Sequence, residues 1–155
     1  MPLFKRQTGR MGYEVHITRR RDWADSDHSR DISFKEFEDL VAQDPQLGYR
    51  DDSYSTLKDG SRRYPAFLIG NIESAVGLIV QPDANGMVPT NWNWLRWNTG
   101  NLQSKYPTPN MIRKMIEIAV QLGAQVQGDD SEIYFINDKG ELANRQPDYE
   151  SWADA

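Results

Sequence analysis

Carboxylates gather near the C-terminal end of the chain, where Asp129, Asp130 and Glu132 follow Gly128. Carboxylate oxygens are the ligands that hard divalent cations prefer. A calcium loop, however, places its acids at alternate positions and has its glycine among them, whereas Gly128 precedes the acids here. We therefore interpret this segment as the solvated tip of a hairpin and predict no metal site.

A histidine motif offers a second route to chemistry. His16-Ile17-Thr18 has the H-x-T form that two-histidine phosphoesterases use twice, on neighbouring strands that face one phosphate. The other histidine, His28, lies in a polar stretch without the matching threonine, so we interpret His16 as a strand histidine that is hydrogen-bonded on the polar face of a sheet. The chain also has no cysteine and none of the common nucleotide, serine-hydrolase or zinc-protease motifs. We predict a protein that is not an enzyme and needs no cofactor.

Tryptophans form the third notable group, because three of the five lie close together at Trp92, Trp94 and Trp97. On a strand, Trp92 and Trp94 share one face and Trp97 lies on the other, so the three cannot all enter one core. Tryptophan, tyrosine and arginine dominate the energetic centres of protein interfaces. We therefore predict that Trp92, Trp94 and the neighbouring Arg96 contact a partner; the alternative is a sheet that is covered on both faces.

The charge of the chain restricts its partners. With 18 basic and 23 acidic residues the net charge is −5, and the acids are concentrated in residues 31–60 and 124–155. Nucleic-acid affinity comes largely from cationic side chains, so we predict no direct nucleic-acid binding. A basic partner is favoured by complementary fields, and Asp51 and Asp52 join the acids of the hairpin as candidate contacts. No apolar run is long enough for a membrane span or a signal peptide, so we expect a cytoplasmic protein without membrane contact.

Two helices are marked by their caps. A capping box at Ser33 and Glu36 precedes an apolar stripe and predicts a helix that ends near Asp44, before a proline. The second helix is predicted over residues 108–122, because a threonine and a proline start it and apolar residues recur at helical spacing. Gly123 follows as its C-terminal cap.

Strands are predicted from alternating and short apolar runs. They cover residues 13–18, 64–69, 75–80, 124–127 and 132–136, and the segment 92–102 forms a strand, a tight turn at residues 98–100 and a second short strand. Most neighbouring runs are joined by turns that are too short for helical crossovers, which favours antiparallel pairing. We predict the α+β class, with a mainly antiparallel sheet of about five to six strands and two helices packed on one face. We expect residues 1–10 to form a flexible basic arm, residues 11–145 a single domain and residues 146–155 an acidic tail.

Several of these segments together resemble a family of small, mostly uncharacterised bacterial proteins. The resemblance is carried by Tyr13–Arg19 with Trp23, by the capped helix near Phe34, and above all by the block from Ile112 to Asp130 with Glu132 and Tyr134 after it. Ser131 stands where the family has a glycine, and residues 106–110 depart from its asparagine-proline-aspartate, which affects a turn and a helix cap. Some members look like immunity proteins encoded beside secreted toxins, and the resemblance brings no catalytic residues with it.

The resemblance implies an immunity protein that binds a cognate toxin domain and occludes its active site or an exosite. If the toxin has a basic active-site cleft, Asp129, Asp130 and Glu132 would enter it as phosphate mimics; otherwise Trp92, Trp94 and Arg96 would block an exosite. One alternative is a small carboxylate-dependent or phosphate-directed enzyme with Asp129, Asp130 and His16 near its site. The other alternative is a general protein-interaction module.

Overall fold

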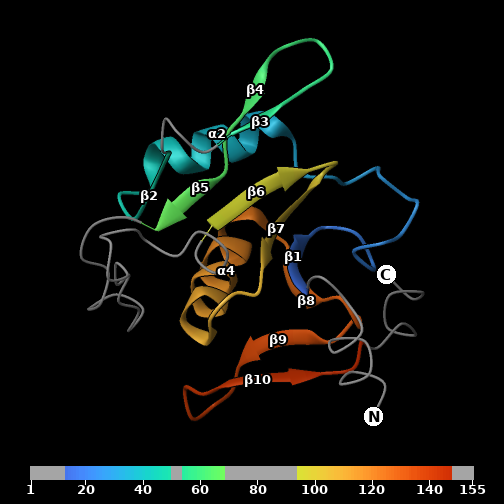
Figure 1. The fold of residues 1–155 in the computed structure, drawn as a ribbon. Coiled ribbons are helices and arrows are strands. Elements are labelled where there is room, and N and C mark those ends of the chain that lie inside the picture. The colour runs from blue at the N-terminus through green and yellow to red at the C-terminus, as the bar shows by residue number, and fades with distance from the viewer. Residues whose placement is uncertain (1–12, 50–53, 69–93, 148–155) are drawn as a thin grey trace.

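A computed structural model describes residues 13–49, 54–68 and 94–147 (Figure 1). Its main feature is an eight-stranded sheet with the strand order β10-β9-β8-β1-β7-β6-β5-β2, in which every pair of neighbours is antiparallel. The strands are β1 (Glu14–Thr18), β2 (Leu47–Tyr49), β5 (Ala66–Leu68), β6 (Trp94–Asn98), β7 (Asn101–Lys105), β8 (Gln125–Gly128), β9 (Ile133–Ile136) and β10 (Leu142–Arg145). A separate hairpin joins β3 (Ser55–Thr56) to β4 (Arg62–Arg63).

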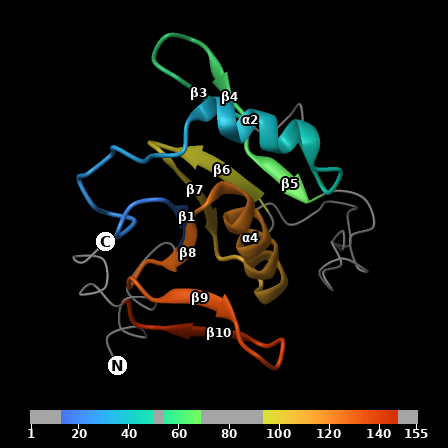
Figure 2. The same ribbon diagram turned by 180° about the vertical axis from the view of Figure 1, so that it is seen from behind.

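Both helices begin where their caps predict. In α2 (Phe34–Gln43) the Ser33 side chain accepts a hydrogen bond from the Glu36 backbone N–H, and the Glu36 side chain accepts one from the Ser33 backbone N–H. In α4 (Pro109–Leu122) the Thr108 side chain accepts from the Met111 backbone, and Gly123 ends the helix in the left-handed conformation. The buried side chains of the two helices belong to one core, together with the inward residues of the central strands. In the view from behind, α4 lies in front of strands β6 and β7 (Figure 2).

The α+β class is confirmed, and the sheet is wider than the five to six strands that the sequence predicts. The additional strands lie at the two ends of the sheet. β10 has the sequence Leu-Ala-Asn-Arg and β2 is three residues long, so neither has the alternating pattern of a half-buried strand. β10 pairs with β9 across a tight turn at Gly140, whose φ is +78°, and β2 pairs with β5. The predicted strand at 75–80, the whole of the predicted basic arm and most of the predicted acidic tail lie outside the described residues.

The sheet has an apolar face and a polar face. Val15 and Ile17 of β1 point toward the helices and are fully buried. His16 lies on the opposite face, in register with Gln103 of β7 and Gln127 of β8. This alternation is what the sequence pattern of β1 predicts.

The polar face of the central strands is covered by the segment 19–31. Its Trp23 ring stacks on the His16 ring, with centroids 4.0 Å apart and planes within 5°. Arg20 holds the segment in place, because its guanidinium bonds the Asp31 carboxylate at 2.8 and 3.0 Å, the Trp23 carbonyl oxygen at 2.9 Å and the Thr99 carbonyl oxygen. The polar stretch around His28 is therefore part of a cover that buries the polar side chains of the sheet.

The described residues include no helix that has both the length and the apolar character needed to span a membrane.

Candidate functional site

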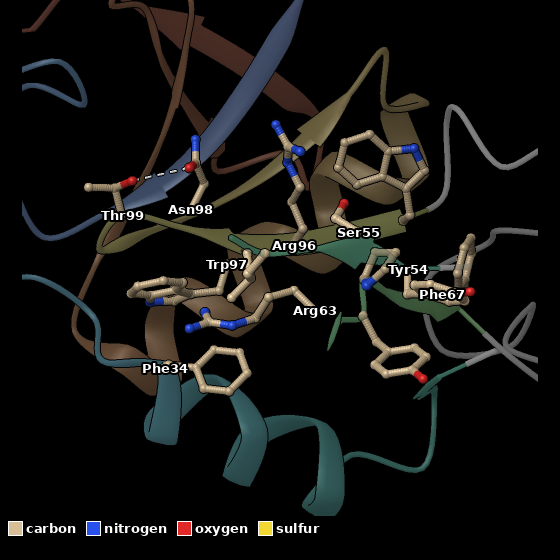
Figure 3. A pocket seen from close by; sticks show the side chains of 13 residues that line it. Phe34, Tyr54, Ser55, Arg63, Phe67, Arg96, Trp97, Asn98 and Thr99 are labelled. Carbon is tan, nitrogen blue, oxygen red and sulfur yellow. Dashed lines mark hydrogen bonds between the residues drawn. The ribbon is translucent and has the colours of Figure 1, made fainter. Parts of the chain in front are cut away.

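A cavity of about 510 Å³ opens where the β3–β4 hairpin, the start of α2 and strand β6 meet (Figure 3). We name it the aromatic–arginine pocket after the side chains that line it. Its arginines are Arg63 and Arg96. Its aromatic residues are Phe34, Tyr54, Tyr64, Phe67, Trp94 and Trp97. This mixture of large apolar surface with a few charged groups is typical of ligand and partner sites.

The pocket exists because strand pairing stops early at this edge of the sheet. Among the described residues, β5 pairs with β6 at Ala66–Leu95 and Phe67–Trp94, and no pair follows toward the C-terminal end of β6. Pro65 precedes this ladder and has no backbone N–H to donate, so the chain leaves β6 there and continues into the β3–β4 hairpin. The C-terminal part of β6, from Arg96 to Asn98, therefore lines the cavity instead of meeting a neighbouring strand on that side.

Stacked rings and guanidinium groups fix the walls of the pocket. The Arg63 guanidinium contacts two rings, with its carbon 3.9 Å from the Phe34 centroid and 5.0 Å from the Trp97 centroid. Figure 3 shows the three side chains together. The two rings also meet edge to face at 5.6 Å, and the Trp97 indole donates a hydrogen bond of 2.8 Å to the Ile32 carbonyl oxygen. These contacts hold the rings in one arrangement before any partner arrives.

The electrostatics of the pocket differ from those of the chain as a whole. The net charge is −5, yet no Asp or Glu is among the described residues that line the pocket. Arg96 is 46% exposed, and Glu14 Oε2 lies 3.9 Å from its guanidinium, a distance at the outer limit for an ion pair. The pocket therefore combines aromatic surface with positive charge, which suits an anionic group attached to an apolar body.

The predicted acidic hairpin is arranged differently from the sequence-based interpretation. The Asp129 carboxylate turns back onto β1, where Oδ1 lies 2.9 Å from His16 Nε2 and Oδ2 accepts the Glu14 backbone N–H at 2.9 Å. Its side chain is 11% exposed and that of His16 is 2% exposed. The prediction that His16 is a strand histidine hydrogen-bonded on the polar face is confirmed. The structure thus brings together His16 and Asp129, two residues of the alternative enzyme hypothesis, but buries the imidazole beneath Trp23.

Glu132 is buried, with 3% exposure, so the interpretation of this residue as part of a solvated tip is wrong. The physical reason is Gly128, where the absence of a side chain leaves room for the Glu132 carboxyl group against the backbone. The Tyr13 hydroxyl lies in the same space and forms a hydrogen bond of 2.8 Å with the Tyr134 hydroxyl. Burial raises the pKa of Glu132 and also raises the pKa of both tyrosines. Glu132 therefore offers a partner almost no surface.

Asp130 is half-buried beside Glu132, whose side chain accepts the Asp130 backbone N–H at 3.3 Å. The other predicted contacts divide into two groups. Trp94 and Arg96 line the pocket, with the Arg96 guanidinium 5.6 Å from the Trp94 ring. Trp92, Asp51 and Asp52 lie outside the described residues. In the parts of the chain that the structure describes, no group of three or more His, Asp, Glu or Cys side chains is placed to hold a metal ion.

The pocket residues outside β6 are not predicted from the sequence. Arg63 and Tyr54 fall in a stretch that is typical of a polar loop, and Phe34 is one member of a helix stripe. Arg63 has a local signal, because the run Arg62-Arg63-Tyr64-Pro65 places cationic and aromatic side chains directly before a residue that interrupts sheet pairing. This signal does not extend to Tyr54 or Phe34.

We compared the chain with known proteins. Neither the models of known protein families, nor the curated proteins, nor the solved structures gave a match to this chain.

Proposed function

We propose that this chain is an immunity protein, which binds a protein toxin through the aromatic–arginine pocket and neutralises it by occlusion. The observation that supports the proposal is the pocket itself, whose aromatic and arginine side chains are held in place by contacts within the chain. These are the residue types that supply most of the binding energy at protein interfaces. Such a function requires no chemistry from the chain.

Preorganisation supports tight binding. Association costs free energy when flexible side chains must be ordered. Here Trp97 is held by its hydrogen bond to the Ile32 carbonyl oxygen, and Arg63 packs over the Phe34 and Trp97 rings, so little ordering remains for these groups. A side chain of the toxin inserted in the pocket would gain apolar contact with rigid walls, while the β3–β4 hairpin beside it would cover neighbouring toxin surface.

The test is rescue of bacteria from the toxin. The toxin domain to use is the one encoded beside this protein, if its expression alone kills the cell. Co-expression of the wild-type chain should restore growth, and Trp94→Ala should restore it less. Arg145→Ala is the matched control, because Arg145 is exposed on β10 at the far end of the sheet from the pocket. A soluble wild-type chain that neither binds the toxin domain nor restores growth would contradict the proposal.

A small carboxylate-dependent or phosphate-directed enzyme is the second candidate. It is favoured by the 2.9 Å contact between His16 and Asp129 and opposed by the burial of the imidazole under Trp23. Turnover of a phosphate ester by the purified protein, abolished by Asp129→Asn, would support it. If the chain instead captured several unrelated partners with similar affinity, the general interaction module would be favoured.

A further inference from the structure

We propose that the aromatic–arginine pocket takes an acidic peptide segment of the partner, in which a large apolar side chain enters the cavity and neighbouring carboxylates bond the arginines. This inference rests on the proposed function for the statement that the occupant belongs to a partner protein. The chemistry of the occupant is argued from the pocket alone.

The first step is the state of Arg63. Its guanidinium carbon lies over the Phe34 and Trp97 rings, and among the described residues no carboxylate lies at ion-pair distance from it; Asp59 acts on it only as a nearby charge. Contacts with ring faces do not occupy all five N–H donors of an arginine. Those donors match the two oxygens of a carboxylate, which arginine binds with two parallel hydrogen bonds.

The second step is Arg96, which leaves β6 on the side opposite to Trp97 (Figure 3). Its present carboxylate neighbour, Glu14, is 3.9 Å away and partly exposed, so solvent screens the attraction. A partner carboxylate at hydrogen-bond distance would replace this contact at little cost. Arg63 of β4 and Arg96 of β6 thus both line the aromatic cavity.

The third step is charge complementarity. A chain of net charge −5 repels acidic partners in general, but this pocket has two arginines and no acid among its described lining residues. Selection of an acidic segment is therefore local to the pocket. The expected partner charge here is the reverse of the basic cleft that the acidic hairpin suggests.

An acidic peptide fits this site better than a nucleic acid does. Single strands bind through stacked bases and also through a groove of cations that follows the phosphates. The pocket provides stacking surface but only two lining arginines. Both are used fully by a short acidic segment, whose central aromatic or aliphatic side chain suits a cavity of about 510 Å³.

The test is calorimetric titration of the full chain with short capped peptides at physiological salt. The probe has a central phenylalanine with glutamates on both sides, and the matched peptides replace the glutamates by glutamines or by lysines. We expect the glutamate peptide to bind about tenfold more tightly than the glutamine peptide, which corresponds to about 1.4 kcal/mol. Arg63→Gln and Arg96→Gln should each remove most of this preference, whereas Arg145→Gln should keep it. Arg63→Lys, which keeps the charge without the planar fork, should recover part of it, and unchanged circular dichroism would show that each variant folds.

Several outcomes would overturn the inference. Equal binding of the glutamate and glutamine peptides would remove the role of charge, and tighter binding of the lysine peptide would reverse it. Tighter binding of a single-stranded oligonucleotide at the same salt would assign the pocket to nucleic acid.

This experiment also separates the inference from the proposed function. Selective binding of the glutamate peptide without rescue from the toxin would leave the pocket chemistry in place and remove the immunity function. Rescue that is unaffected by Arg63→Gln and Arg96→Gln would leave the function in place and remove the inference.

Discussion

Gly100→Ala tests how the cover over the polar face is held. Gly100 has a φ of +92°, and a Cβ there would overlap the Asp31 carboxyl group and stand 2.6 Å from Asp31 Cβ. The backbone strain costs about 1–2 kcal/mol. Displacing the Asp31 carboxylate also leaves the Arg20 guanidinium, which is buried, without its ion-pair partner. Removing one partner of such a pair costs about 3–5 kcal/mol when the pair is fully buried, and we take about 2–3 because Asp31 is partly exposed.

The expected total is about 3–5 kcal/mol, measured by urea unfolding with circular dichroism, and a fall in Tm of roughly 6–20 °C. The control is Asp31→Gly, which removes the clash and the ion pair together. In that background Gly100→Ala should cost only the backbone strain, so the two changes should be less than additive by about 2 kcal/mol. Full additivity, or a cost below about 1 kcal/mol for Gly100→Ala alone, would refute the clash with Asp31 and the role of the Arg20 ion pair.

Three further predictions concern the folded state. Gly128→Ala should destabilise the protein by about 1–3 kcal/mol in urea unfolding, because its Cβ would stand 2.5 Å from Glu132 Cδ and break the hydrogen bond between Tyr13 and Tyr134. A neutral effect would contradict the packing at Gly128. Glu132 has a raised pKa, so its contribution to stability is present below its unfolded pKa of 4.5 and is lost as pH rises through the folded pKa; Glu132→Gln should remove this loss, and an unchanged pH profile would contradict it. Arg19 lowers the pKa of Glu36 to about 2, so the stability that Glu36 gives is present above pH 4.5 and is lost as pH falls toward 2; an acid-unfolding curve that Glu36→Gln leaves unchanged would count against the pair.

Local signals predicted much of the fold. The caps of α2 and α4 lie within a few residues of the side chains they bond, and the alternation of β1 assigns Val15 and His16 to opposite faces correctly. Local signals do not predict β10, because its four residues show no alternating pattern and the strand is ordered by pairing with β9.

The sites depend on contacts that are distant in sequence, and this limits what the sequence can predict. Trp94 and Arg96 were identified as candidate contacts because they are close together in the chain. Arg63 meets Phe34 and Trp97 only after the chain has folded, so no spacing rule joins these three residues. Glu132 illustrates the same limit, since its burial depends on the space at Gly128 and on Tyr13, which lies just before β1.

We propose that the toxin is recognised by the aromatic–arginine pocket. The Kd of the purified toxin domain for the wild-type chain, for Trp94→Ala and for Arg145→Ala measures this recognition. We predict that Trp94→Ala weakens binding by about thirtyfold, the effect of a hot-spot residue worth about 2 kcal/mol, while Arg145→Ala binds like the wild type. Wild-type affinity in Trp94→Ala, with the variant correctly folded, would contradict the claim.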